Sequence, residues 1–174
     1  MRRRRIPIAL SANKLTASVK ELKYYQKLMQ AKMDALRQRV ADILADEVRR
    51  GFSGAVVDDL ISGGRRFADV QVLVSYGPDA ALVIAWGKDA IWVEFGAGIY
   101  HNGAGGSSPH PKGTELGFTI GGYGKGQGNK ETWGFYEKGE LYLTRGTPAA
   151  APMYSAAGQI AGIIADTVRE VFGS

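Results

Sequence analysis

The chain has no cysteine and only two histidines among its 174 residues. The missing thiols exclude disulfides, thiolate catalysis and cysteine-ligated zinc. His101 and His110 stand nine residues apart, with neither the helical spacing of a metal pair nor an acidic partner. We therefore expect no bound metal, no cofactor and two solvent-exposed loop histidines.

Long hydrophobic runs are also absent. No apolar stretch approaches the roughly 20 residues that a bilayer-spanning helix needs. Ile6–Leu10, behind four arginines, is too short for the apolar core of a signal peptide and contains Pro7. With 45% hydrophobic and 22% charged residues, the composition is typical of a globular protein. We expect one soluble domain.

The net charge of +5 is unevenly distributed. Arg2–Arg5 supply four positive charges, residues 6–50 hold nine Lys/Arg against five Asp/Glu, and residues 51–174 hold nine against twelve. A basic first third on an acidic remainder favours head-to-tail docking between copies. An arginine arm also suits phosphate or an acidic partner protein. A merely solvated tail and helix face remain equally open.

An amphipathic helix is predicted from about Thr16 to Arg50, because apolar residues recur there at spacings of three and four. Gly51 stands where a C-terminal cap is expected. A rod of about 35 residues and roughly 50 Å is longer than a compact domain of this size needs. Either part of it packs on a neighbour, or the helix is kinked near Gln30–Asp34 and covers only its own sheet.

Two β-hairpins and a final helix follow from the pattern of the remaining chain. Residues 51–68 predict a loop with at most a helical turn around Val56–Ile61. Alternating apolar residues and turn signals predict two hairpins. The second strand of the first hairpin, Ala81–Trp86, is apolar throughout and is expected to be central in the sheet. The predicted strands are Asp69–Tyr76 with Ala81–Trp86, and Trp133–Tyr136 with Leu141–Thr144. A helix is expected from Pro152 to Gly173.

Residues 101–130 contain ten glycines and are too long for an ordinary connection in a compact domain. Neither glycine-rich phosphate-binding motif fits Gly121–Gly128, so we expect a surface segment that orders against a partner. The predicted fold is α+β: an antiparallel β-sheet with a long N-terminal helix and a C-terminal helix packed on it, plus this loop. Residues 1–15 form a basic arm and residues 16–174 a single domain.

Glu94 is the one acidic residue in the apolar run Ile91–Gly96. General acid catalysis there would need a second carboxylate, and none lies at a helpful spacing. We interpret Glu94 as a capping or pairing group at the end of an apolar element, with Phe95 and Gly96 at a structural turn under the sheet.

Three blocks of the sequence resemble the phage minor tail-component family, also called tail-completion, neck or head-to-tail joining proteins. Trp92-Val93-Glu94-Phe95-Gly96-Ala97-Gly98 resembles its Y-V-E-F-G-T-G signature. Ser108-Pro109-His110-Pro111, followed by Gly113, resembles the variable loop of its long-loop members. Ala150–Ala157, with Pro152 and Met153, resembles the A-x-P-F-M-x-x-A start of a final helix. Arg3–Ser11 also resembles the start of such proteins, whereas Ala97 and Met153 depart from the usual Thr and Phe.

The resemblance implies a non-enzymatic virion protein of long-tailed phages with no catalytic residues. It implies a ring, commonly six-fold, that joins the portal or connector and head-closure proteins to the tail tube or tail terminator. The expected location is the virion neck, and the host cytoplasm during assembly, with genomic DNA nearby in the channel and no membrane. Interface candidates are the arm and the aromatic side chains, for which burial in the monomer core is an equally open alternative. They are Arg2, Arg3, Arg4, Arg5, Tyr123, Trp133, Tyr136 and Tyr142.

Two other classes of protein remain open. Basic residues interleaved with aromatics around Tyr24–Lys27 and Tyr123–Lys130, together with the arginine arm, suit a nucleic-acid-associated binding module. A metal-dependent hydrolase would have to use His101 and His110.

Overall fold

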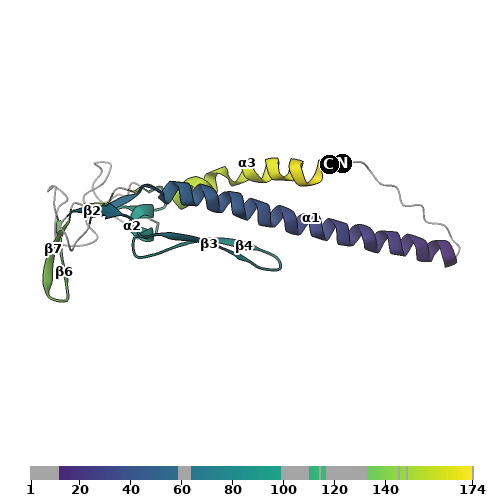
Figure 1. Ribbon diagram of the computed structural model, residues 1–174, viewed down its shortest axis with the longest axis horizontal. Helices are drawn as coiled ribbons and strands as arrows, with labels where there is room; N and C mark the ends of the chain where they lie inside the picture. Colours follow the sequence, from purple (N-terminus) through teal and green to yellow (C-terminus); the bar gives the residue numbers. More distant parts are fainter. Residues whose placement is uncertain are drawn as a thin grey trace.

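The computed structural model describes residues 12–58, 64–98, 110–113, 115–116, 133–144, 146–147 and 149–173. It confirms the predicted α+β class, with a long helix at one end of the chain and a second helix at the other (Figure 1). The helices are α1 (Ala12–Phe52), α2 (Ala90–Phe95) and α3 (Pro152–Phe172). The strands are β1 (Val56–Asp58), β2 (Arg65–Phe67), β3 (Gln71–Tyr76), β4 (Ala81–Trp86), β5 (Ala97–Gly98), β6 (Trp133–Glu137), β7 (Glu140–Thr144) and β8 (Gly146–Thr147).

The strands of the described residues form four separate antiparallel pairs, β1–β2, β3–β4, β5–β8 and β6–β7. The expectation that β4 is central in a sheet is therefore wrong, since β3 is its one strand partner within the described ranges. The apolar run of β4 reflects a hairpin with apolar side chains on both faces. Its inner face packs on α1 and its outer face is exposed.

Helix α1 is one unbroken helix of 41 residues. No helix break falls at Gln30–Asp34, so the alternative of a kinked or split helix is wrong. Residues 12–52 contain no proline, and their single glycine is Gly51; these are the residues that most often kink or end a helix. At about 1.5 Å per residue the rod is roughly 60 Å long.

Gly51 does not end α1, contrary to the sequence prediction. The helix continues to Phe52, and the residue with left-handed backbone is Gly54, at φ 81°. Gly51 instead lies where α1 meets the start of α3, because a Cβ at this position would stand 2.6 Å from the Cβ of Pro152. The missing side chain permits the close approach of the two helices.

Val56–Asp58 is a strand and not the helical turn that we expected. It pairs with β2 in the register Val56↔Phe67, and β-branched valines suit such a position. The carbonyl of Ala55 accepts a hydrogen bond from Ala68 N at 2.8 Å, which extends the pairing by one step.

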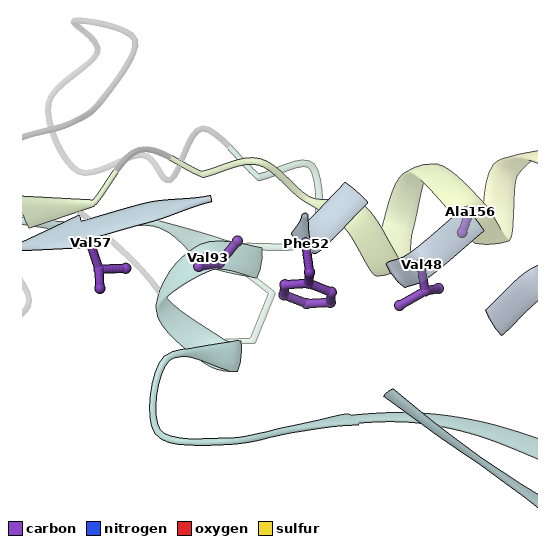
Figure 2. Close-up of a cluster of buried hydrophobic side chains, with 5 residues drawn as sticks. All are labelled: Val48, Phe52, Val57, Val93 and Ala156. Atoms are coloured by element: carbon purple, nitrogen blue, oxygen red, sulfur yellow. The ribbon is translucent and has the colours of Figure 1, made fainter. Parts of the chain in front are cut away.

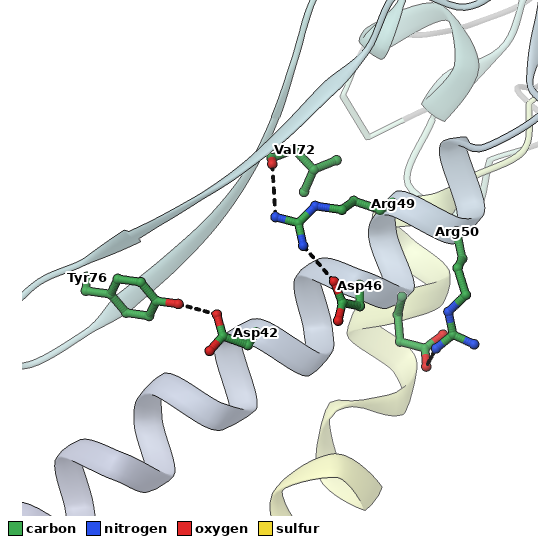
Figure 3. Close-up of polar contacts among 7 residues, drawn as sticks. Asp42, Asp46, Arg49, Arg50, Val72 and Tyr76 are labelled. Carbon is green, nitrogen blue, oxygen red and sulfur yellow. Dashed lines mark hydrogen bonds and ion pairs between the residues drawn. The ribbon is translucent and has the colours of Figure 1, made fainter.

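The two predicted hairpins are both present. At the tip of β3–β4, Arg37 donates to the carbonyl of Pro78 at 2.6 Å. Figure 3 shows two further contacts, from Arg49 to the carbonyl of Val72 at 3.3 Å and from the Tyr76 hydroxyl to Asp42. These contacts fix the hairpin along α1. In β6–β7 the turn residues Lys138 and Gly139 have φ of 52° and 87°, as a tight hairpin turn with two left-handed residues requires.

The core lies where the C-terminal end of α1 meets β1, α2 and the start of α3. Its buried apolar side chains come from these four elements (Figure 2): Val48, Phe52, Val57, Val93 and Ala156. Half-buried residues of the inner hairpin face, Val72, Val83 and Ala85, pack against it. The core is small and lies at the C-terminal end of the long helix α1, which forms the frame of the molecule (Figure 1).

Helix α3 runs beside the C-terminal part of α1 (Figure 1). Near the end of α3, Lys32 Nζ donates to the carbonyl of Val171 at 2.7 Å, and Arg39 pairs with Glu170 at 2.7 Å. Residues 12–31 of α1 therefore extend past α3. They also pass the hairpin tip, which Arg37 marks. None of the helices within the described ranges is long and apolar enough to cross a bilayer.

We expect Gly51→Ala to lower the free energy of unfolding by about 1–2 kcal/mol, because overpacking against Pro152 outweighs the better helix propensity of alanine. Gly158→Ala is the matched control, since a Cβ there meets nothing within 4 Å. It should raise stability by up to about 1 kcal/mol. Chemical denaturation measures both, and equal shifts of the same sign would contradict the proposed role of Gly51.

Candidate functional site

The start of α3 lacks a capping side chain of its own. Ala151 is the N-cap residue, in a left-handed conformation at φ 49°, and it makes no side-chain hydrogen bond to the helix. Pro152 occupies the first turn and has no N–H. The N–H groups of Met153 and Tyr154 would have no intrahelical partner.

Glu94, on α2, supplies the missing cap from 59 residues earlier in the chain. Its Oε2 accepts a hydrogen bond from Met153 N at 2.8 Å and its Oε1 accepts one from Tyr154 N at 3.0 Å. The residue is only 7% exposed. A carboxylate at this place also interacts favourably with the positive end of the helix dipole.

His110 is the third donor to Glu94. Its Nε2 lies 3.1 Å from Glu94 Oε1, and its Nδ1 accepts a hydrogen bond from Lys112 N at 2.9 Å. Because a backbone N–H can only donate, Nδ1 is the acceptor in this bond and Nε2 is the nitrogen that donates to Glu94. The ring is 4% exposed, and it packs 4.4 Å from the ring centroid of Phe95 and 5.3 Å from that of Tyr154.

The expectation of an exposed histidine at position 110 is therefore wrong. The sequence offered no acidic neighbour, but the fold places Glu94 beside it. His101 lies outside the described residues.

Gly96 allows the chain to leave α2 against the segment that leads into α3. Its φ is +78°, a conformation that glycine adopts without cost. A Cβ would stand 3.0 Å from Ala149 N and 3.2 Å from the carbonyl of Thr147. Close by, Ala150 N donates to the carbonyl of Val93 at 2.8 Å.

The three sequence blocks of the resemblance thus meet at one place, which we call the α2–α3 joint (Glu94, Phe95, Gly96, His110, Met153 and Tyr154). Several further block residues lie within the described ranges. Val93 and Pro152 are buried, Trp92 is 39% exposed, and Gly98 pairs with Gly146 between β5 and β8.

The other end of α2 is held by an ion pair that the sequence did not reveal. Arg66 donates to both carboxylate oxygens of Asp89, at 2.6 and 2.9 Å, and Asp69 N donates to Asp89 at 2.7 Å. Burial raises the pKa of Asp89, but the hydrogen bonds from Arg66 and Asp69 N outweigh it, and the pKa lies below its ordinary value. An aspartate directly before Ala90–Phe95 is a helix-start signal; nothing in the sequence indicates Arg66 as its partner.

The structure describes the side chains of two of the interface candidates, Tyr136 and Tyr142. Tyr136 is 75% exposed, whereas Tyr142 is half-buried and its hydroxyl donates to Glu140 at 3.0 Å. Trp133 opens β6, and its side chain lies outside the described set, as do Tyr123 and Arg2, Arg3, Arg4 and Arg5.

The joint offers little for catalysis. Three N–H donors occupy the Glu94 carboxylate, and the imidazole uses both ring nitrogens. In the described segments, no three His, Asp or Glu side chains gather as a metal ion would require.

No protein-family profile, no curated protein and no solved structure matches this chain.

We expect Glu94→Ala to lower the free energy of unfolding by about 3 kcal/mol, because it leaves several buried N–H donors without an acceptor. Glu170→Ala is the matched control in an exposed pair with Arg39, where at most about 1 kcal/mol is expected. Urea titrations followed by circular dichroism measure both. Equal losses would show that Glu94 is not a structural cap.

The Asp89–Arg66 pair predicts a pH dependence. Because the pKa of Asp89 is lowered in the folded state, the Asp89–Arg66 pair stabilises the protein fully above the ordinary aspartate pKa of about 4. This stabilisation is lost as the pH falls through the lower folded-state pKa. The stability gap between the wild type and Asp89→Asn should therefore be constant near neutral pH and shrink below about pH 4. Urea midpoints between pH 7 and pH 2 measure the gap, and Arg66→Gln should narrow it. A gap independent of pH would refute this account.

Proposed function

We propose that this chain is a non-enzymatic structural subunit of the head-to-tail junction of a tailed bacteriophage. Copies of it form a ring, six-fold as the resemblance implies, between the portal or connector and the tail tube. The phage assignment is supported by the three resemblance blocks. They are far apart in sequence, yet they converge on the α2–α3 joint.

The observation that carries the proposal is how little the described chain covers its own apolar surface. Among the described residues, seven hydrophobic residues and Pro152 are buried, while many large apolar side chains are at least one third exposed. They gather on separate faces, and soluble monomers rarely expose apolar patches of large size. Such faces are typical of a subunit that is completed by its neighbours.

The β6–β7 hairpin carries one of these faces, at the end of the frame away from the N-terminus of α1 (Figure 1). Tyr136 stands opposite Leu141 in the strand register, and Leu143 follows two residues later on the same face. The three side chains are 75%, 54% and 65% exposed. Aromatic and aliphatic anchors of this kind suit contact with a connector or tail protein.

The role of the joint supports a structural rather than a catalytic protein. Its carboxylate and imidazole are buried, mutually bonded and used to hold the start of α3. Nothing in that geometry leaves a reactive atom facing solvent.

The test is made in a phage or prophage that carries this gene. Blocking the gene should yield DNA-filled heads and separate tails in electron micrographs, and the wild-type gene supplied in trans should restore joined particles. Mass spectrometry should find the protein in purified virions. Normal tailed virions without the protein would refute the proposal.

One observation favours the second candidate, a nucleic-acid-associated module. Lys20, Lys23 and Lys27 are exposed and lie on one face of α1, at spacings of three and four. With Arg2–Arg5 they would bind phosphates in a salt-dependent manner. A gel shift with DNA that weakens steeply with salt and is lost on deleting residues 2–5 would favour this candidate.

A further inference from the structure

Helix α1 carries an apolar seam with a strict heptad spacing, which begins in the part of the helix that extends past α3 (residues 12–31, the projecting half). Apolar residues follow one another at alternating steps of four and three, with a single polar member, Gln26. The seam consists of Leu15, Val19, Leu22, Gln26, Met29, Met33, Leu36, Val40 and Ile43. Four heptads of this kind are typical of a helix that packs along another element.

The seam is more deeply covered where α3 runs beside α1, and there Leu36, Val40 and Ile43 are half-buried. Beyond the end of α3, Leu15, Val19 and Leu22 are 51%, 43% and 47% exposed, whereas Met29 is half-buried. Met33, beside the last turn of α3, is 50% exposed. A shallow groove runs along this part of α1, lined by Val19, Leu22, Met29 and Met33 among others. The described chain provides nothing that fills it.

The charge of the projecting half indicates what kind of surface covers the seam. Residues 12–31 hold four lysines and one acidic residue, Glu21, a net charge of +3. Two such halves side by side would repel each other, which disfavours pairing of α1 with α1. The seam requires an apolar surface of neutral or negative charge.

The outer face of the β3–β4 hairpin is such a surface. Leu73, Ile84 and Trp86 are 51%, 42% and 50% exposed, and Leu82 is 60% exposed. Leu73 stands opposite Ile84 in the register, so these side chains form one continuous face. Residues 69–86 contain neither lysine nor arginine; of their two acidic residues, Asp69 pairs with Lys88 at 4.0 Å and Asp79 lies at the hairpin turn, so the face is neutral or slightly negative.

The two surfaces also agree in size. The exposed seam from Leu15 to Met33 spans roughly 27 Å at 1.5 Å per residue. A six-residue strand spans about 20 Å. The hairpin already receives a helix on its inner face, where Val72 and Val83 pack toward α1.

We propose that the projecting half of α1 from one copy lies on the outer β3–β4 face of the next copy, so that each hairpin is held between its own α1 and a neighbour's. The inference rests on the proposed function, since it names the contact that builds the ring. The two surfaces differ, so the contact is heterologous, and repetition of a heterologous contact around an axis closes a ring.

The test uses two complementary variants of the full chain. Variant A carries Val19→Asp and Leu22→Asp, which destroys the seam and leaves the hairpin intact. Variant B carries Leu82→Lys and Ile84→Lys, which destroys the outer hairpin face and leaves the seam intact. Circular dichroism checks that both fold, and light scattering after size exclusion gives the mass of each alone and of an equimolar mixture.

We expect the wild type to assemble beyond a dimer, A and B each to be monomers, and the mixture to form a 1:1 dimer with twice the monomer mass. In that dimer the seam of B lies on the hairpin of A, and neither copy can extend the chain. A matched control, Ala17→Asp with Ala31→Asp, places the same charges on the opposite side of α1 and should assemble like the wild type.

Several outcomes would overturn the inference. A variant B that dimerises alone would assign the seam to α1–α1 pairing. A mixture that stays monomeric, a variant A that still assembles, or a wild type that is monomeric at every concentration would each exclude the proposed contact. If the protein is present in virions but its variants do not behave as expected, the proposed function stands and the proposed contact is wrong. If the two variants form a 1:1 dimer but the protein is absent from virions, the contact stands and the proposed function is wrong.

Discussion

The bond network around the Glu94 carboxylate is the interaction on which the rest of the structure depends. Two of its three donors are backbone N–H groups at the first turn of α3, and the third is the imidazole of His110. The local sequence of α3 provides no cap, so this helix has a satisfied start only when α2 lies against it. The joint therefore couples three distant chain segments, and through α3 it couples them to α1. Local helix propensity alone would not set this geometry.

A long frame with a small core follows from the same arrangement. The chain concentrates its buried side chains where α1, α2, β1 and α3 meet, and it extends a helix and two hairpins away from that point. Helix α1 packs on only one face of the β3–β4 hairpin, so the other face is exposed. The part of α1 that extends past α3 has an exposed apolar seam. The described chain therefore gains less free energy from a central core than a compact domain does, and many of its large apolar side chains stay exposed.

Much of the fold was predictable because its signals are local. The three-and-four spacing of α1 and α3 and the alternation around Gly77–Asp79 and Lys138–Gly139 need no knowledge of distant residues. Val56–Asp58 was missed although its partner strand β2 is close in the sequence, because strands of three residues are too short for a clear alternating pattern. Two other failures have the opposite property. The role of Gly51 was not predicted because its partner, Pro152, is about a hundred residues away. His110 was expected in solvent for the same reason. Its acidic partner is on another element, and no spacing rule finds it. The predictions for residues 101–109 and 117–130, and for residues 1–11 of the arm, lie outside the described residues. Residues 12–15, predicted as part of the arm, belong to α1.

The contacts between α1 and α3 end near Lys32, which donates to the carbonyl of Val171, so residues 12–31 of α1 form a lever that extends past α3. The tip of this lever is roughly 30 Å from Lys32, so a bend of about 5° at Lys32 displaces the tip by roughly 3 Å. A small change in the direction of the helix where α3 ends thus produces a larger shift at its tip. If copies of the chain assemble through this part of α1, as we propose, the spacing between copies depends on that bend.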